Sequence, residues 1–145
     1  MNDPGTVLYI GSATATPAAL EKREFKVRSA KPEEGIRELF RLNGSVCVAV
    51  IEDTDGRSAW SFLKLMRSHL FMTPVVVITD AKNLTAFADL DVFEFLGHPI
   101  SADVLVESVS VCEQTYAKFH EEIKHTHRHI EEAMQDDYTK AANFR

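Results

Sequence analysis

Side chains that could bind an ion follow several of the short apolar runs in this sequence. Asp53 and Asp55 follow one run, Thr79 follows the next, and His98 follows the last. Magnesium is a hard cation that prefers carboxylate oxygens, so Asp53 and Asp55 are the candidate Mg²⁺ ligands. Asp-x-Asp-Gly is also common in plain turns, and a purely structural turn is the alternative interpretation.

The apolar runs themselves predict the strands that must position these side chains. Solidly apolar, mostly β-branched runs such as Val46–Ile51 are typical of strands covered on both faces of a parallel sheet. The predicted strands are Thr6–Ile10, Phe25–Ala30, Val46–Ile51, Val75–Ile78 and Val92–Leu96.

Segments with helical spacing lie between these strands. Thr16 and Pro17 form a suitable N-cap and first-turn pair for the first helix. The predicted helices cover residues 16–23, 33–42, 58–70 and 82–90, with a last helix beginning after Ser101. This alternation predicts an α/β fold with a doubly wound, five-stranded parallel sheet, and we expect the flavodoxin-like strand order 2-1-3-4-5.

In such a sheet, ligands and chemistry gather at the carboxyl ends of the strands. Three segments at these ends have an informative order and spacing: AVIED at residues 49–53, ITDA at 78–81 and FEFLGHPI at 93–100. Together they resemble the receiver domain of bacterial response regulators, over residues 5 to 115. The resemblance implies a signalling module that contacts partner proteins.

The resemblance also assigns positions. Asp53 lies at the phospho-acceptor position, Thr79 and Phe95 lie at the two switch positions, and His98 replaces the family's lysine. Pro99 follows His98 as a proline follows that lysine in receivers, which predicts a tight turn with a cis peptide bond.

Other positions depart from the receiver pattern. Gly11 and Ser12 stand where receivers carry an acidic pair, which should lower the affinity for Mg²⁺ sharply. His98 with an ordinary pKa of about 6.5 would be mostly neutral at pH 7. The loop after Asp53 is also shortened. These departures predict a pseudoreceiver in which Asp53 does not accept phosphate in the standard way.

A second resemblance concerns the loop that follows the first strand. Ser12 and Thr14 match part of the FMN phosphate loop of flavodoxins. Ala15 replaces its glycine and Pro17, which has no N–H donor, replaces its last threonine. A flavin or a small anion bound at this loop is therefore kept as an alternative.

The segment 116–145 differs in composition from residues 1–115. It is rich in Glu, His and Lys, and its apolar residues follow helical spacing: Tyr116, Phe119, Ile123, Ile130 and Met134. We expect a receiver-like domain at 1–115 and a C-terminal helical extension at 116–145. The apolar stripe must be buried somewhere, which predicts a weak coiled coil in a homodimer or a helix docked on its own domain.

Composition narrows the possible functions. The 145 residues carry a net charge of −6, which argues against nucleic-acid binding. No apolar stretch approaches the length of a membrane span, and the first residues do not resemble a signal peptide, so a cytoplasmic protein is expected. Cys47 and Cys112 lie in apolar runs and are expected to be buried free thiols.

The sequence thus predicts a non-enzymatic signalling module without a cofactor, apart from weakly bound Mg²⁺. Its partner would be another signalling protein or a histidine kinase. Two alternatives remain: a stand-alone response regulator phosphorylated at Asp53 by a histidine kinase, and a flavodoxin-like binder of flavin or an anion.

Overall fold

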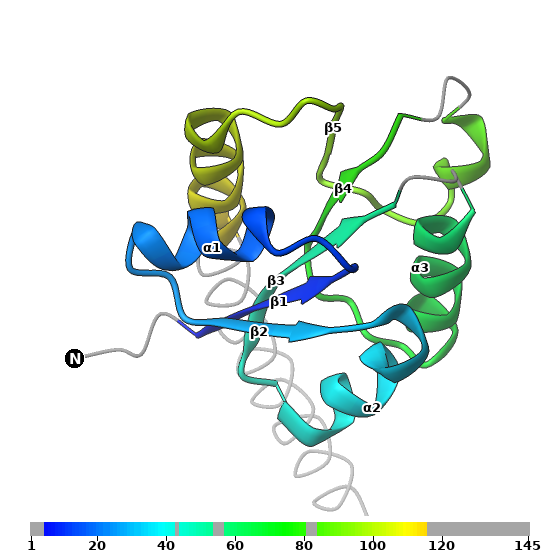
Figure 1. Ribbon diagram of the computed structural model, residues 1–145. Helices are drawn as coiled ribbons and strands as arrows, with labels where there is room; N and C mark the ends of the chain where they lie inside the picture. Colours follow the sequence, from blue (N-terminus) through cyan, green and yellow to red (C-terminus); the bar gives the residue numbers. More distant parts are fainter. Residues whose placement is uncertain (1–4, 43, 54–56, 81–83, 116–145) are drawn as a thin grey trace, which may run out of the picture.

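Five parallel strands form the centre of the computed structural model, which describes residues 5–42, 44–53, 57–80 and 84–115 (Figure 1). The strands are β1 (Thr6–Ile10), β2 (Val27–Ala30), β3 (Val46–Glu52), β4 (Val75–Ile78) and β5 (Glu94–Leu96). The helices are α1 (Ala15–Lys22), α2 (Pro32–Leu42), α3 (Ser58–Ser68), the short 3₁₀ helix η1 (Thr85–Phe87) and a C-terminal helix described over residues 102–115.

The strand order is β2-β1-β3-β4-β5, which confirms the predicted flavodoxin-like topology. In the parallel register, Ile10 of β1 lies opposite Ile51 of β3, and Glu52 lies opposite Ile78 of β4. The carboxyl ends of β1, β3 and β4 therefore meet at one edge of the sheet.

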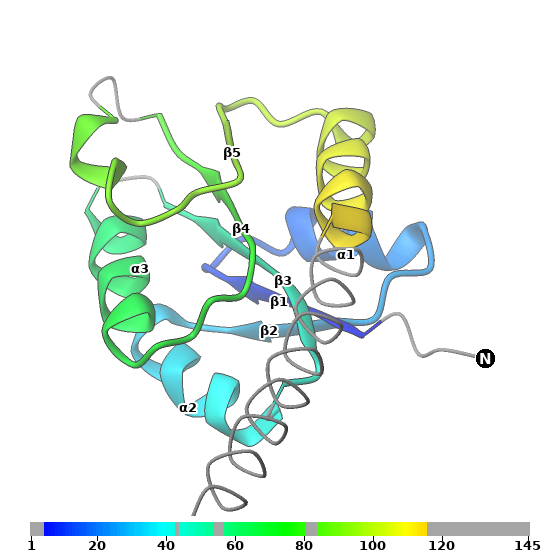
Figure 2. The same ribbon diagram turned by 180° about the vertical axis from the view of Figure 1, so that it is seen from behind.

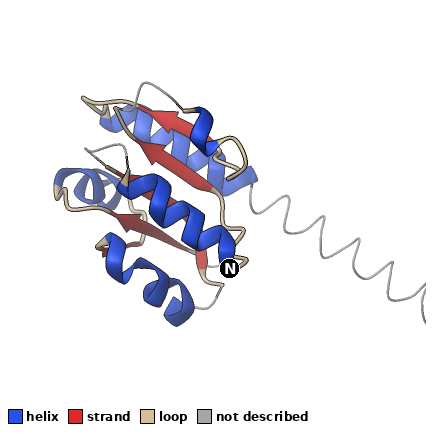
Figure 3. Ribbon diagram, turned by 90° about the vertical axis from the view of Figure 1, so that its right-hand side faces the viewer, coloured by secondary structure: helices blue, strands red, loops and turns tan. Residues whose placement is uncertain are grey.

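Helices cover both faces of the sheet, as the side view in Figure 3 shows. The side chains of α2, α3 and η1 pack with Ala49 and Ile51 on one face. Leu20 of α1 and Leu105 of the C-terminal helix pack with Val48 and Val50 on the other face. Figure 2 shows α1 and the yellow C-terminal helix together on that side of the sheet. Every β3 side chain from Val46 to Ile51 is buried, which explains the solidly apolar sequence of this strand.

The alternation of side chains along β3 has a direct consequence at its end. Because successive side chains point to opposite faces, Glu52 continues the row of Val48 and Val50, whereas Asp53 continues the row of Ala49 and Ile51. The two adjacent carboxylates are thereby directed to different helical layers.

The predicted helix at residues 82–90 is wrong within the described residues, which begin at 84 in this segment. There the chain forms only the single 3₁₀ turn η1. Its apolar residues Leu84, Phe87 and Leu90 recur every third position and all pack on the core, and three residues per turn is the period of a 3₁₀ helix.

Arg67, near the end of α3, holds the chain between η1 and β5. Its guanidinium donates hydrogen bonds to the carbonyl oxygens of Leu90 at 2.8 Å and Asp91 at 2.9 Å. It also donates to those of Phe71 at 2.7 Å and Thr73 at 2.9 Å. One side chain thus connects the loop between α3 and β4 to the segment that precedes β5. The strand β5 begins at Glu94 instead of the predicted Val92.

Other predictions can be compared with the same described residues. Cys47 and Cys112 are buried and form no disulfide within the described residues, as expected. The helical extension predicted for residues 116–145 lies outside the described part of the chain. Within the described part, none of the helices is long and apolar enough to cross a membrane.

Candidate functional site

Glu52, the last residue of β3, receives hydrogen bonds from three other segments of the chain. The hydroxyls of Tyr9 and Thr16 donate to its Oε1 at 2.7 and 2.6 Å. Its Oε2 lies 2.6 Å from Nε2 of His98. These partners come from β1, α1 and the loop after β5, so one carboxylate links both sides of the carboxyl edge.

Thr16 does not have the predicted role of a helix N-cap. The helix α1 already begins at Ala15, and Thr14 precedes it without a capping side-chain hydrogen bond. Thr16 is buried and its hydroxyl points to Glu52 instead. The physical reason is that the carboxylate of Glu52, whose side chain is only 9% exposed, needs hydrogen-bond donors, and this need outweighs a helix cap.

His98 lies between two carboxylates. Its Nε2 faces Glu52, and its Nδ1 lies 3.0 Å from Oδ2 of Asp80. The backbone N–H of His98 also donates to Oδ1 of Asp80 at 3.0 Å. With a carboxylate at each ring nitrogen, the doubly protonated imidazolium is the form that donates at both positions.

The charges of this cluster stabilise one another. The hydrogen bond to Glu52 raises the pKa of His98 above 6.5 against the opposing effect of desolvation, and Asp80 raises it further. The expectation of a neutral His98 rested on its ordinary pKa, and this environment shifts that pKa toward the charged form. Burial would raise the pKa of Glu52, but the hydrogen bonds from Thr16, Tyr9 and His98 outweigh it and lower that pKa.

Tyr9 connects this cluster to the β1–α1 loop. Its hydroxyl donates to Glu52 and also accepts a hydrogen bond from the backbone N–H of Ala13 at 3.2 Å. Burial, followed by the neighbouring Glu52, raises the pKa of Tyr9 well above 10. The phenol therefore remains a protonated donor over the whole physiological pH range.

Asp53 has a separate environment at the start of α3. Its Oδ2 accepts a hydrogen bond from the backbone N–H of Ala59 at 3.1 Å. Its Oδ1 is buried and has no hydrogen-bond partner among the described residues. The structure brings His98 to Glu52 and Asp80, while Asp53 faces the opposite layer. Asp55 lies outside the described residues, so the predicted pairing of Asp53 with Asp55 around Mg²⁺ stays a prediction.

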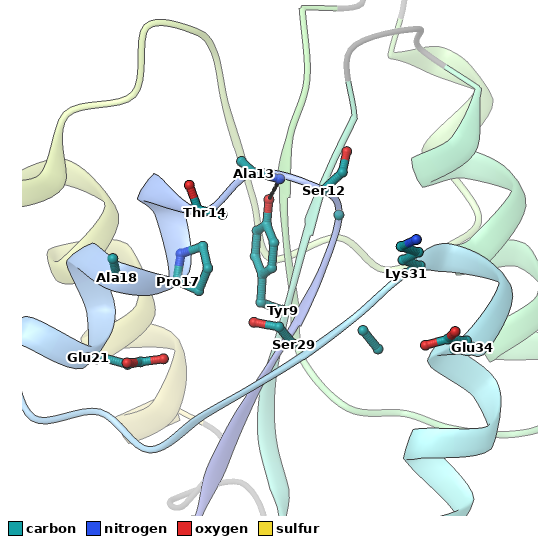
Figure 4. Close-up of a pocket in the computed structure, with 12 residues that line it drawn as sticks. Tyr9, Ser12, Ala13, Thr14, Pro17, Ala18, Glu21, Ser29, Lys31 and Glu34 are labelled. Carbon is teal, nitrogen blue, oxygen red and sulfur yellow. Dashed lines mark hydrogen bonds between the residues drawn. The ribbon is translucent and has the colours of Figure 1, made fainter.

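A groove of about 550 Å³ adjoins the cluster on the β2 side of Tyr9. Figure 4 shows the Tyr9 ring between the β1–α1 loop and α1 on one side and Lys31 with Glu34 on the other. Gly11, Ser12 and Thr14 line this groove. Within the described residues, no group of three or more His, Cys, Asp or Glu side chains is arranged to hold a metal ion.

Comparison with known proteins shows which solved structures share this fold. No protein-family model and no curated protein matches the sequence. A response regulator receiver domain from Clostridium thermocellum is 18% identical with a TM-score of 0.68, and the match covers 79% of this chain and 98% of that one. A CheY-like receiver domain protein from Methanospirillum hungatei is 15% identical, with a TM-score of 0.67 and coverages of 79% and 97%.

A response regulator from Thermotoga maritima is 20% identical, with a TM-score of 0.62 over 76% of this chain and 98% of that one. The chain has the receiver fold. The turn expected after β5 in this fold is present, because the His98–Pro99 peptide bond is cis as predicted.

The other positions that the receiver resemblance assigns lie at or next to the carboxyl ends of β1, β4 and β5. Thr79 is buried directly after β4, and its backbone N–H donates to Leu96 O at 2.9 Å. Phe95 is half-buried and packs edge-to-face on Phe87, with ring centroids 5.3 Å apart. Gly11 and Ser12 follow β1, and the N–H of Gly11 donates to Ala30 O at 3.1 Å.

Sequence reasoning missed the central residue of the receiver edge. The sequence pattern places Glu52 beside Asp53 and Tyr9 within an apolar strand, and it singles out neither residue. The available signal was the alternation along β3, which puts Glu52 in line with Val48 and Val50 and therefore next to α1. A carboxylate in that row has to find donors on β1 and α1, and Tyr9 and Thr16 are the polar side chains that reach it.

Proposed function

We propose that this chain is a receiver-like signalling module that acts through contact with a partner protein and without phosphorylation of Asp53. The observation that carries the proposal is the 2.6 Å contact between His98 Nε2 and Glu52 Oε2. At the position where the receiver resemblance expects a lysine, the cationic group is already engaged by a carboxylate of the chain itself.

The charge balance of the edge supports this proposal. Phosphoryl transfer to a carboxylate brings two anions together and requires a metal ion or a free cation to neutralise them. His98 lies between Glu52 and Asp80, and Gly11 and Ser12 supply no carboxylates for a metal. The cation is therefore committed to existing anions before any phosphate arrives.

Mass spectrometry tests the proposal. The intact protein is incubated with Mg²⁺ and acetyl phosphate, beside the Asp53→Asn and Glu52→Gln variants. We expect no phosphate adduct on the wild-type protein while it remains folded. An adduct that disappears in Asp53→Asn contradicts the proposal, and an adduct that disappears only in Glu52→Gln contradicts it in favour of Glu52 as acceptor.

One observation favours a second candidate function, a stand-alone response regulator phosphorylated at Asp53 by a histidine kinase. Within the described part of the chain, Oδ1 of Asp53 is buried and has no hydrogen-bond partner, and a carboxylate oxygen in that state gains from a cation or a covalent substituent. The same mass measurement decides between this candidate and the first one.

The proposed contact surface lies on the side of β5 and the C-terminal helix. Val104 and Val111, seven residues apart on the C-terminal helix, are large apolar side chains with 47% and 45% of their surface exposed. Exposed apolar side chains on one helix face are typical of protein-contact surfaces. A partner signalling protein bound there needs neither an enzyme activity nor a cofactor of this chain, and a cytoplasmic location without nucleic-acid or membrane binding belongs to the same proposal.

The proposal includes a homodimer formed through the segment 116–145. Its support is the apolar stripe of the sequence, which needs a covering surface. Light scattering of the full chain is expected to give a dimer mass. Ile123→Glu on the stripe should yield a monomer, whereas Lys124→Glu beside the stripe should remain dimeric; a monomeric wild-type chain excludes the dimer.

A further inference from the structure

The groove beside Tyr9 results from the chain direction after the first two strands. After β1 the chain turns into α1 on one face of the sheet, and after β2 it turns into α2 on the other face (Figures 1 and 4). The two connections diverge, and a space of about 550 Å³ opens between them at the carboxyl edge. This volume lies in the range of sites for small molecules.

The walls of the groove carry charges of opposite sign. Figure 4 shows Glu21 of α1 on one side of the Tyr9 ring and Lys31 on the other, with Glu34 next to Lys31. No ion pair that involves Lys31 or Glu21 is among the salt bridges of the described residues. Hydroxyl groups of Ser12, Thr14 and Ser29 add neutral donors and acceptors between the walls.

We propose that this groove binds a short zwitterionic peptide of two or three residues, with its carboxylate toward Lys31 and its ammonium group toward Glu21. Charge-assisted hydrogen bonds at both ends fit a ligand whose charges are separated by a polar backbone. The exposed side chain of Ala18 provides an apolar contact for the middle of the peptide, above the buried Tyr9 and Pro17.

The same walls disfavour the flavin phosphate of the sequence-based alternative. One ammonium group and two carboxylates, those of Glu21 and Glu34, give the groove a net charge of −1. A phosphate dianion would be repelled by this balance, and Pro17 cannot donate a backbone hydrogen bond to it.

Tyr9 couples the groove to the Glu52–His98 cluster. Its ring is buried beneath the groove, while its hydroxyl joins the loop at Ala13 to Glu52. A peptide that contacts this loop moves Ala13, and through the Tyr9 hydroxyl it changes the hydrogen bond to Glu52 and the environment of His98. The ligand is thus an input that takes the place of phosphorylation, an interpretation that rests on the proposed function.

Nuclear magnetic resonance tests binding and coupling separately. Trialanine is titrated into ¹⁵N-labelled full-length protein, and amide shifts are expected at residues 11–14 and at Lys31. Trialanine acetylated at its N-terminus and amidated at its C-terminus lacks both charges and should cause no such shifts. Absence of shifts with trialanine overturns the proposal, and equal shifts with both peptides overturn the charge-based recognition.

Matched variants locate the site. Lys31→Ala and Glu21→Gln should each weaken trialanine binding by about tenfold. Lys26→Ala and Glu33→Gln change the same residue types outside the groove and should leave the affinity within about twofold. Equal weakening by the control variants would identify non-specific ionic binding and overturn the site.

Coupling has its own readout. In the wild type, trialanine should shift the ring signals of His98. Tyr9→Phe keeps the ring but removes both hydrogen bonds, so binding should persist while the His98 shift disappears. A His98 shift that persists in Tyr9→Phe overturns the coupling, whereas phosphorylation of Asp53 in the mass experiment would overturn the proposed function and leave the binding result intact.

Discussion

The hydroxyl of Tyr9 occupies the space that a side chain on Gly11 would need. A Cβ built on Gly11 would lie 2.6 Å from Tyr9 Oη and 2.9 Å from its Cζ, with the carbonyl oxygen of Glu52 at 3.2 Å. Gly11 and Tyr9 are therefore a matched pair. The phenol that donates to Glu52 fills the space that an acidic side chain at position 11 would need.

Gly11→Asp is accordingly expected to destabilise the protein by about 1–3 kcal/mol, because the added side chain overpacks against a buried phenol. Urea denaturation measures the change in the free energy of unfolding. Tyr9→Leu on its own removes a hydrogen-bond donor from Glu52. The double variant Tyr9→Leu with Gly11→Asp should lose less unfolding free energy than the sum of the losses in the two single variants. Strict additivity in this cycle would contradict the pairing.

Gly35→Ala tests the contact between α2 and α3. A Cβ on Gly35 would clash with Phe62 Cε2 and would lie 2.8 Å from Ile10 Cδ1. Although alanine favours a helix interior, we expect a loss of about 1–3 kcal/mol, measured by thermal and urea unfolding. Gly97→Ala, whose Cβ meets nothing within 4 Å, is the control, and a stabilising Gly35→Ala would refute the close packing.

Arg67→Met should destabilise the protein by about 2–4 kcal/mol, because carbonyl oxygens that accept from the guanidinium lose their donor. Arg67→Lys should restore only part of this loss, since an ammonium group cannot reproduce the planar fork. Hydrogen exchange should rise at residues 90–93 in both variants. Arg37→Met on the exposed face of α2 provides the comparison, and equal effects at the two arginines would argue against the clamp.

The His98 cluster predicts a pH dependence of stability with a defined sign. The pKa of His98 is raised in the folded protein, so its contribution is complete below the unfolded pKa of about 6.5 and is lost as the pH rises through the folded pKa. The pKa values of Glu52 and Asp80 are lowered. Their contribution is present above their unfolded pKa values of about 4 and is lost as the pH falls through the folded values.

Stability attributable to the cluster should therefore be greatest between about pH 4.5 and 6.5. Urea unfolding of the wild type and His98→Gln between pH 4 and 9 measures this contribution as the difference between the two curves. The difference should narrow as the pH rises above the folded pKa of His98. A constant difference across the range would show that the imidazole contributes without its charge.

The parallel sheet could be predicted from the sequence because its three central strands, β1, β3 and β4, each carry a strong apolar signal. Val46–Ile51 and Val75–Ile78 have no polar residue that would allow an exposed face, and this feature specifies a parallel, doubly covered sheet. The helix predicted around Phe87 failed because a spacing of three residues satisfies a 3₁₀ turn as well as a short helix.

The site was harder to predict because its important contacts are not local. The resemblance to receivers directed attention to Asp53, and the cis bond before Pro99 followed correctly from it. The partners of His98 depend on which of two adjacent carboxylates faces α1. The alternation of side chains along β3 and the hydrogen bond from Tyr9 determine which carboxylate faces α1. Tyr9 is 43 residues away from Glu52 in the chain.

Glu52 and Asp53 are neighbours in the chain but act on different layers of the molecule. A proton or ligand that reaches Glu52 affects α1 and the loop of His98, whereas a group that reaches Asp53 affects the first turn of α3. One peptide unit thus separates two different environments. An insertion or deletion of a single residue in β3 would exchange the faces to which Glu52 and Asp53 point. Each carboxylate would then contact the other's partners, although the same residue types would remain at the edge.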